Sequence, residues 1–330
     1  MTQPASYHRG IHRLAVFLAG YVVLLITAGG LVKSLEAGLS VPDWPLSYGM
    51  LNPPRWWEIE TVRAEHGHRL IAGVALILTI VLTVWIARRE ERPWVRRVAW
   101  LALLAVVAQA ALGGITVLFF LPTAISVSHA ALAQFFLLLI VTLAVVTSRF
   151  WLSARQPAPG SDARAVIGIS TATTVAIYLQ ILIGAVMRHT GAGLAIPDFP
   201  LVFGGLIPPR LDFGIAIHYL HRLGALLVAT LIFWLLGRIL RLAGNERALL
   251  RPGLWLVGLV LLQGTLGGLV VWTSKAVLPN TLHVGGGALV LATSMLLQLI
   301  SRRLGWLQGR EPVTAGDSAL GVLQAERVTS

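Results

Sequence analysis

The 330-residue chain has 56% hydrophobic residues, only 12% charged residues and a formal net charge of +12. So much apolar surface excludes an ordinary soluble domain, whose core could not bury it, and indicates a protein that is solvated mostly by lipid. The chain has no cysteine, which excludes disulfides, thiolate chemistry, iron–sulfur clusters and covalent attachment of a c-type heme.

Apolar runs of about 20 residues, the length that crosses the hydrocarbon layer as a helix, recur along the whole chain. They predict an all-α membrane protein with eight transmembrane helices near residues 12–32, 69–87, 98–120, 124–148, 165–187, 216–237, 254–273 and 281–300. The first run is too long for the h-region of a signal peptide and lacks a clear cleavage pattern, so we expect it to be retained.

The basic residues lie in short segments between the predicted helices and form no continuous stripe, which argues against nucleic acid as a partner. Most of the 26 Lys and Arg fall on the side of the membrane that holds the N-terminus. By the positive-inside rule, this excess predicts that both termini are cytoplasmic. We therefore expect a multi-pass protein of the plasma membrane whose main contact is the lipid bilayer.

The chain repeats itself at an offset of about 154 residues. The matched segments are Gly38–Leu46 with Gly193–Leu201, His68–Leu70 with His221–Leu223, Gln109–Gly114 with Gln263–Gly268, and His129 with His283. Four helices per copy is an even number, so both copies share one orientation and are related by an axis along the membrane normal. The repeat predicts two tandem pseudo-symmetric four-helix bundles.

The predicted domains follow from the repeat. They are a cytoplasmic N-terminus (1–11), an N-terminal four-helix half (12–148), a cytoplasmic linker (149–164), a C-terminal four-helix half (165–303) and a flexible cytoplasmic tail (304–330). Lys33 and Arg188 end the first helix of each half, and we interpret both as topology determinants.

Two loops with the pattern Pro-Asp-aromatic-Pro lie between the first and second helix of each half. Trp44 and Phe199 in these loops are either interfacial anchors or parts of a lid over each bundle. The glycine pairs at 113–114 and 267–268 let helices, or a flat macrocycle, approach closely.

Four histidines recur in matched places near the outer leaflet. His68 and His221 begin the second predicted helix of each half, and His129 and His283 lie about one turn inside the fourth. Two imidazoles from facing helices are what a heme iron takes as axial ligands, and an apolar bundle can hold a porphyrin. The alternative for any single histidine is a neutral ring bonded to a backbone carbonyl, but the repeated pairing favours heme.

The remaining histidines and two arginines have weaker interpretations. We expect His8 and His12 to be solvated or to face lipid, and His189 to lie in an outer loop with a surface role. Arg69 and Arg222 follow the matched histidines, where they either bond to heme propionates or snorkel to the interface.

The two halves differ at Glu65, whose matching residue is His218. Each precedes the matched histidine by three residues and shares its helix face. A carboxylate beside a porphyrin could take up a proton or stabilise positive charge during oxidation, and an imidazole cannot do the latter. We therefore expect chemistry in the N-terminal half and a resident heme in the C-terminal half. The alternative is that Glu65 only pairs with Arg63 or Arg69.

These residues resemble the heme A synthase family, membrane enzymes that convert heme O to heme A for terminal oxidases. The resemblance covers about residues 10–303. It rests on the segments Gly29–Val32, Gly38–Gly49, Glu65–Arg69 and Arg188–Gly193 and on the four repeated histidines.

The resemblance implies an oxidoreductase that converts a porphyrin methyl group to a formyl group in successive two-electron steps. Glu65 would be the catalytic carboxylate, His68 and His129 would flank heme O, and His221 and His283 would hold heme b. Contacts with heme O synthase and with cytochrome oxidase assembly are implied, and a homo-oligomer is left open. A b-type cytochrome and a duplicated transporter are the competing functions.

Many family members carry a cysteine pair in the first outer loop, where this chain has Val41 and Ser47, matched by Ile196 and Val202. We interpret the missing thiols as dispensable structural staples. If the thiols were required, this chain would be inactive.

Overall fold

The computed structural model describes residues 7–153, 161–243 and 246–305. Eight of its helices are long and apolar enough to cross a membrane: α1 (Arg9–Ser34), α2 (Glu60–Arg89), α3 (Pro93–Leu118), α4 (Thr123–Val146), α6 (Ser161–His189), α7 (Phe213–Ala243), α8 (Arg247–Trp272) and α9 (Val277–Gly305). The predicted all-α membrane fold is confirmed. The expected flexible tail, apart from residues 304–305, lies outside the described residues.

Several helices are longer than the hydropathy pattern predicts. Helix α2 begins at Glu60, well before the predicted start at 69, because its first turns are polar and carry no hydrophobic signal. An acidic residue at this end is favoured by the helix dipole. His68 therefore lies two turns inside α2 rather than at its start. Two short helices, α5 (Arg149–Ser153) and the 3₁₀ helix η1 (Ala192–Leu194), were not predicted.

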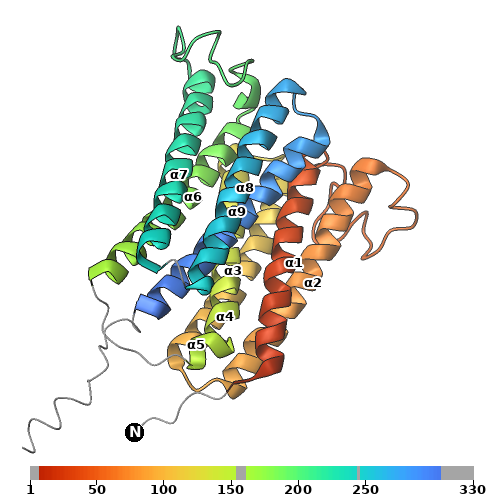
Figure 1. The fold of residues 1–330 in the computed structure, drawn as a ribbon. Coiled ribbons are helices and arrows are strands. Elements are labelled where there is room, and N and C mark those ends of the chain that lie inside the picture. The colour runs from red at the N-terminus through yellow and green to blue at the C-terminus, as the bar shows by residue number, and fades with distance from the viewer. Residues whose placement is uncertain (1–6, 154–160, 244–245, 306–330) are drawn as a thin grey trace, which may run out of the picture.

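Each half packs its four long helices in the same order (Figure 1). Helix α1 packs against α2, α2 against α3, α3 against α4 and α4 against α1, and α6 to α9 repeat this ring. The halves meet where α1 packs on α9 and α4 packs on both α6 and α9. These are the contacts that the predicted pseudo-symmetry axis would require, because the repeat matches α1 with α6 and α4 with α9.

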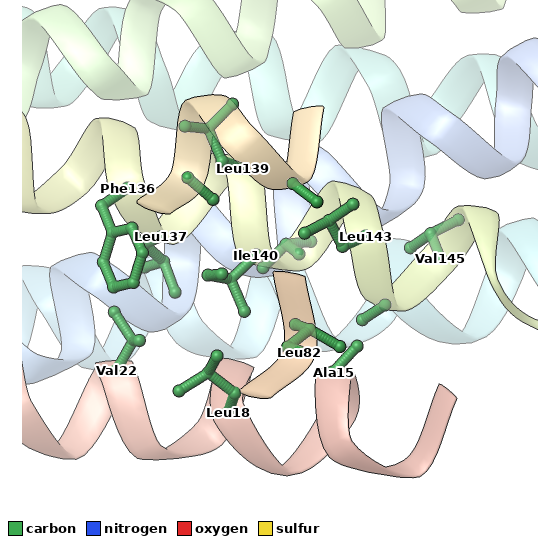
Figure 2. Packing of buried hydrophobic residues seen from close by; sticks show 14 of the residues in the cluster. Ala15, Leu18, Val22, Leu82, Phe136, Leu137, Leu139, Ile140, Leu143 and Val145 are labelled. Atoms are coloured by element: carbon green, nitrogen blue, oxygen red, sulfur yellow. The ribbon is translucent and has the colours of Figure 1, made fainter. Parts of the chain in front are cut away.

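The apolar core centres on α4, which with α9 is the most buried of the spanning helices. Phe136, Leu137 and Ile140 of α4 pack toward Leu18 of α1 and Leu82 of α2 (Figure 2). Large apolar side chains on the opposite faces of other helices, such as Trp100, Leu226 and Trp255, remain exposed. In a bilayer those faces meet lipid, so no soluble partner is needed to cover them.

Glycines allow α1 and α9 to approach closely where the halves meet. A Cβ atom added to Gly30 would lie 3.1 Å from the Cβ of Val284, and one added to Gly285 would collide with Thr27. Small residues at such crossings bring helix backbones together, which is how transmembrane helices gain packing energy in lipid. The close packing between the halves therefore depends on having glycine at these two positions.

We predict that Gly30→Leu lowers the free energy of unfolding by about 1–3 kcal/mol, the usual cost of overpacking. Gly20→Leu on the same helix is the matched control, because nothing lies within 4 Å of its Cβ position. Thermal unfolding of the detergent-purified proteins would check this. Equal midpoints for both variants would show that the α1–α9 contact is not tight.

Candidate functional site

Each of the four repeated histidines faces a glycine on a neighbouring helix. A Cβ atom on that glycine would lie 2.9–3.4 Å from the histidine Cε1. The facing pairs are His68 with Gly29, His129 with Gly113, His221 with Gly184, and His283 with Gly267. Sequence reasoning singled out Gly113 and Gly267 but missed the role of Gly29 and Gly184. Their recurrence at the repeat offset was the available signal.

The structure brings the predicted histidine pairs together. The rings of His221 and His283 have centroids 6.3 Å apart and planes 74° apart. His68 on α2 lies close enough to His129 on α4 to interact with it electrostatically. All four histidines are partly buried. Each half therefore presents two facing imidazoles inside its bundle.

Three of these rings carry a buried nitrogen without a partner. The Nδ1 atoms of His68, His129 and His283 make no hydrogen bond to the described residues. In His221, Nδ1 lies 3.0 Å from Nε2 of Gln180, which also donates to the His221 carbonyl. Unpaired buried polar atoms are costly and uncommon, so these three rings are not held in place by a hydrogen bond at Nδ1. The alternative of rings bonded to backbone carbonyls does not describe these histidines.

Glu65 is buried and held at both oxygens. Its Oε1 accepts from Arg69 at 2.7 Å, and its Oε2 accepts from the Val41 backbone N–H at 2.8 Å. Of the two ion-pair partners considered, Arg69 is therefore the one observed. In the other half, the Ile196 N–H donates to Nδ1 of His218 at 3.2 Å. Glu65 and His218 thus each accept a hydrogen bond from the backbone N–H at the same position of the loop, Val41 in the first half and Ile196 in the second.

Arg69 and Arg222 clamp the loops rather than reaching toward lipid or water. The terminal nitrogens of Arg69 donate to Glu65 and to the carbonyls of Asp43, Leu46 and Val41 at 2.7–3.0 Å. Those of Arg222 donate to the carbonyls of Asp198, Leu201 and Ile196 at 2.7–3.3 Å. All four terminal hydrogens of Arg69 are therefore in use, so these nitrogens cannot also bind a propionate in this conformation.

A carboxylate closes each loop on itself. Asp198 accepts from the backbone N–H groups of Gly204 and Phe203 at 2.7 and 2.8 Å, as Asp43 does from the matching amides in the first half. The bond from Gly204, helped by that from Phe203 and by the charge of Arg222, holds the pKa of Asp198 below its ordinary value. The loops are thus ordered by their own charged groups at neutral pH.

The loop aromatics lie over the glycine pairs. The Trp44 ring lies where a side chain on Gly114 would be, and the Phe199 ring does the same at Gly268. Gly113 and Gly267, one residue earlier, face the second histidine of each half. This placement favours the lid interpretation over simple interfacial anchors.

The positions that lack cysteine are buried in the folded loop. Val41 is fully buried, and the Ser47 hydroxyl lies 2.8 Å from Nδ1 of His66. In the second half, Ile196 and Val202 pack in an apolar cluster instead. Both loops are closed without a disulfide. His66, which sequence reasoning passed over, supplies the polar contact in the first half.

Two of the weaker expectations, for His12 and His189, are wrong, and a third is incomplete. His12 does not face lipid or water, because its Nδ1 lies 3.0 Å from the Ala144 carbonyl. His189 is not a loop residue but the partly buried last residue of α6. Arg188 does more than set topology, because it donates to the Gly30 carbonyl and the Ser34 hydroxyl across the joint between the halves, both at 2.8 Å. His8 lies 3.2 Å from the Arg89 carbonyl.

Comparison with known proteins gives one consistent family. The model of the family described as Cytochrome oxidase assembly protein (COX15-CtaA) matches residues 12–295. The heme A synthase of Symbiobacterium thermophilum is 33% identical over 284 residues, covering 82% of this chain and 89% of the relative. Those of Shouchella clausii and Halalkalibacterium halodurans are 31% and 29% identical, covering 82% and 90% of this chain and 90% and 98% of the relatives.

We predict that Arg69→Gln lowers the free energy of unfolding by about 3 kcal/mol, because it leaves the buried Glu65 without its ion pair and releases the loop. Arg63→Gln is the matched control, since Arg63 is exposed and makes one bond, to the Trp57 carbonyl. Thermal unfolding and the rate of proteolysis within residues 35–59 would be measured. An equal loss in both variants would contradict the clamp.

Proposed function

This chain belongs to the COX15-CtaA family of cytochrome oxidase assembly proteins, and we propose that it is a heme A synthase, which oxidises a methyl group of heme O to a formyl group. The observation that carries this proposal is the mismatch in the repeated site. At matched positions that receive the same loop amide, the N-terminal half has the buried carboxylate of Glu65 and the C-terminal half has His218.

The C-terminal pair fits a resident heme b. The ring centroids of His221 and His283 lie 6.3 Å apart, and neither Gly184 nor Gly267 places a Cβ atom against the rings. These two imidazoles would hold the heme, which would supply a redox centre. Gln180 lies against Nδ1 of His221. With its amide turned so that Oε1 accepts from Nδ1–H, it would orient the ring as outer-shell partners commonly do for metal ligands.

The N-terminal pair is the proposed substrate site, with heme O between His68 and His129. Arg69 and the Val41 amide favour the charged form of Glu65 and fix its position. A fixed carboxylate can take up a proton released from the oxidised methyl group and can stabilise positive charge nearby. The loop that carries Val41 and Trp44 also covers the bundle, so we propose that it keeps water from the reacting edge.

Several coarser features follow from the same proposal. We place both termini in the cytoplasm and both heme sites toward the outer leaflet of the plasma membrane, on the strength of the basic-residue pattern. Contact with the enzyme that delivers heme O is expected from the insolubility of this substrate. An electron-passing b-type cytochrome would use the four histidines equally well, but it would give Glu65 no task.

We predict that Glu65→Gln abolishes formation of heme A while leaving bound heme unchanged, because the amide keeps the shape of the side chain but loses its charge. The matched control is Glu60→Gln, which changes an exposed carboxylate in the first turn of the same helix. Hemes would be extracted and chromatographed from cells that also make heme O. Full activity of Glu65→Gln would remove the catalytic assignment.

We also predict that His221→Ala removes the absorption spectrum of the resident heme, whereas His68→Ala keeps it and loses product. The two histidines occupy matched positions in α7 and α2, so each serves as the control for the other. The spectra of the purified proteins would be compared at equal protein concentration. A resident spectrum that disappears with His68→Ala and persists with His221→Ala would reverse the assignment of the halves.

A further inference from the structure

Arg188 is a cation at the joint between the halves whose hydrogen-bond partners are all neutral. Its Nη2 donates to the Gly30 carbonyl and the Ser34 hydroxyl of α1, and its Nη1 lies 3.3–3.4 Å from two oxygens of Asn280 on α9. No carboxylate of the described residues forms an ion pair with it. Glu36 acts on Arg188 electrostatically but forms its ion pair with Lys33. A partly buried guanidinium that has only neutral hydrogen-bond partners is a candidate for binding an anion.

The position of Arg188 relates it to the C-terminal histidine pair. Gly184 and Arg188 are four residues apart on α6 and share a helix face, and Gly184 faces the His221 ring. On α9, Asn280 and His283 also share a face, and Arg188 interacts electrostatically with His283. The guanidinium therefore lies about one turn beyond the imidazoles, toward the loops.

We propose that Arg188 binds a carboxylate of the porphyrin held by His221 and His283. This inference rests on the proposed function, which supplies the porphyrin. Heme carries two propionates, and their charge favours the end of the bundle nearest to water. A guanidinium binds a carboxylate with charge-assisted hydrogen bonds. The bonds from Nη1 to Asn280 are long, so this nitrogen can exchange them for a carboxylate at little cost.

The other arginines near the histidines are less suited to this role. The donors of Arg69 and Arg222 are mostly occupied by loop carbonyls. These bonds hold the folded loop together, so exchanging them for a propionate would open the lid. Arg188 also uses all four of its terminal hydrogens, but the two on Nη1 form only the long bonds to Asn280, and these bonds hold no loop in place.

The matched cation in the first half already has a carboxylate from its own chain. Lys33 lies four residues after Gly29, which faces His68, and pairs with Glu36 at 2.9 Å. Glu36 adopts a φ of 52° where the second half has Gly191 with a φ of 76°. A porphyrin carboxylate in the first half must therefore compete with Glu36. This difference suits a substrate that leaves, whereas Arg188 suits a cofactor that stays.

The test compares iron protoporphyrin IX with its dimethyl ester, which lacks the charged carboxylates. Full-length protein from heme-deficient cells, carrying His68→Ala to restrict binding to the C-terminal pair, is titrated with each porphyrin. We expect the free acid to bind about tenfold more tightly, as one charge-assisted bond permits. With Arg188→Gln added this preference should fall to about one, while Arg210→Gln, which changes an exposed loop arginine, should leave it intact.

An undiminished preference for the free acid in Arg188→Gln, or no preference in the parent protein, would overturn the inference. If Arg188→Gln does not fold, Arg188→Met fills similar space without charge and carries the same expectation. Failure of the proposed function would be distinguishable, since the protein with an intact His68 would then make no heme A while the porphyrin titration could still depend on Arg188.

Discussion

The structure depends on a requirement that membranes impose on any irregular segment near a buried site: backbone carbonyls that leave the helix need donors. Arg69 and Arg222 meet this requirement because each guanidinium donates hydrogen bonds to several carbonyls of one loop. Because each arginine directly follows one of the repeated histidines, the loop and the imidazole are fixed to the same turn of helix. In the first half, the same guanidinium also fixes Glu65, so the loop, the carboxylate and the His68 imidazole form one unit.

The two halves keep this frame and differ in what it holds. Glu65 replaces the imidazole of His218, the pair of Ser47 with His66 replaces an apolar contact of Val202, and the ion pair of Lys33 with Glu36 has no counterpart beside Arg188. All three differences add polar or charged groups to the first half. They fit a half that binds and releases a changing substrate beside one that retains a cofactor.

Hydropathy made the spanning helices predictable, because a helix that crosses lipid needs a long apolar run. The internal repeat singled out the four histidines, because each recurs at the matched position of the other half. The start of α2 was not predictable in this way, since its first turns are polar and are stabilised by contacts of Glu65 and Arg69 with the loop that precedes them. The partners of Arg188 and His12 lie on helices distant in sequence. No local pattern reports such contacts, so both residues were assigned too simple a role.

The contacts between the halves have a consequence for how such a site could arise. Helix α1 packs on α9, and α4 packs on α6, which are equivalent pairs under the repeat. Two copies of a single four-helix unit could use the same surfaces to form a symmetric dimer. Such a dimer must carry identical residues on both sides, so it could have two carboxylate sites or two imidazole sites, never one of each. Only after the two units were joined in one chain could a glutamate at position 65 face a different evolutionary fate from the histidine at position 218.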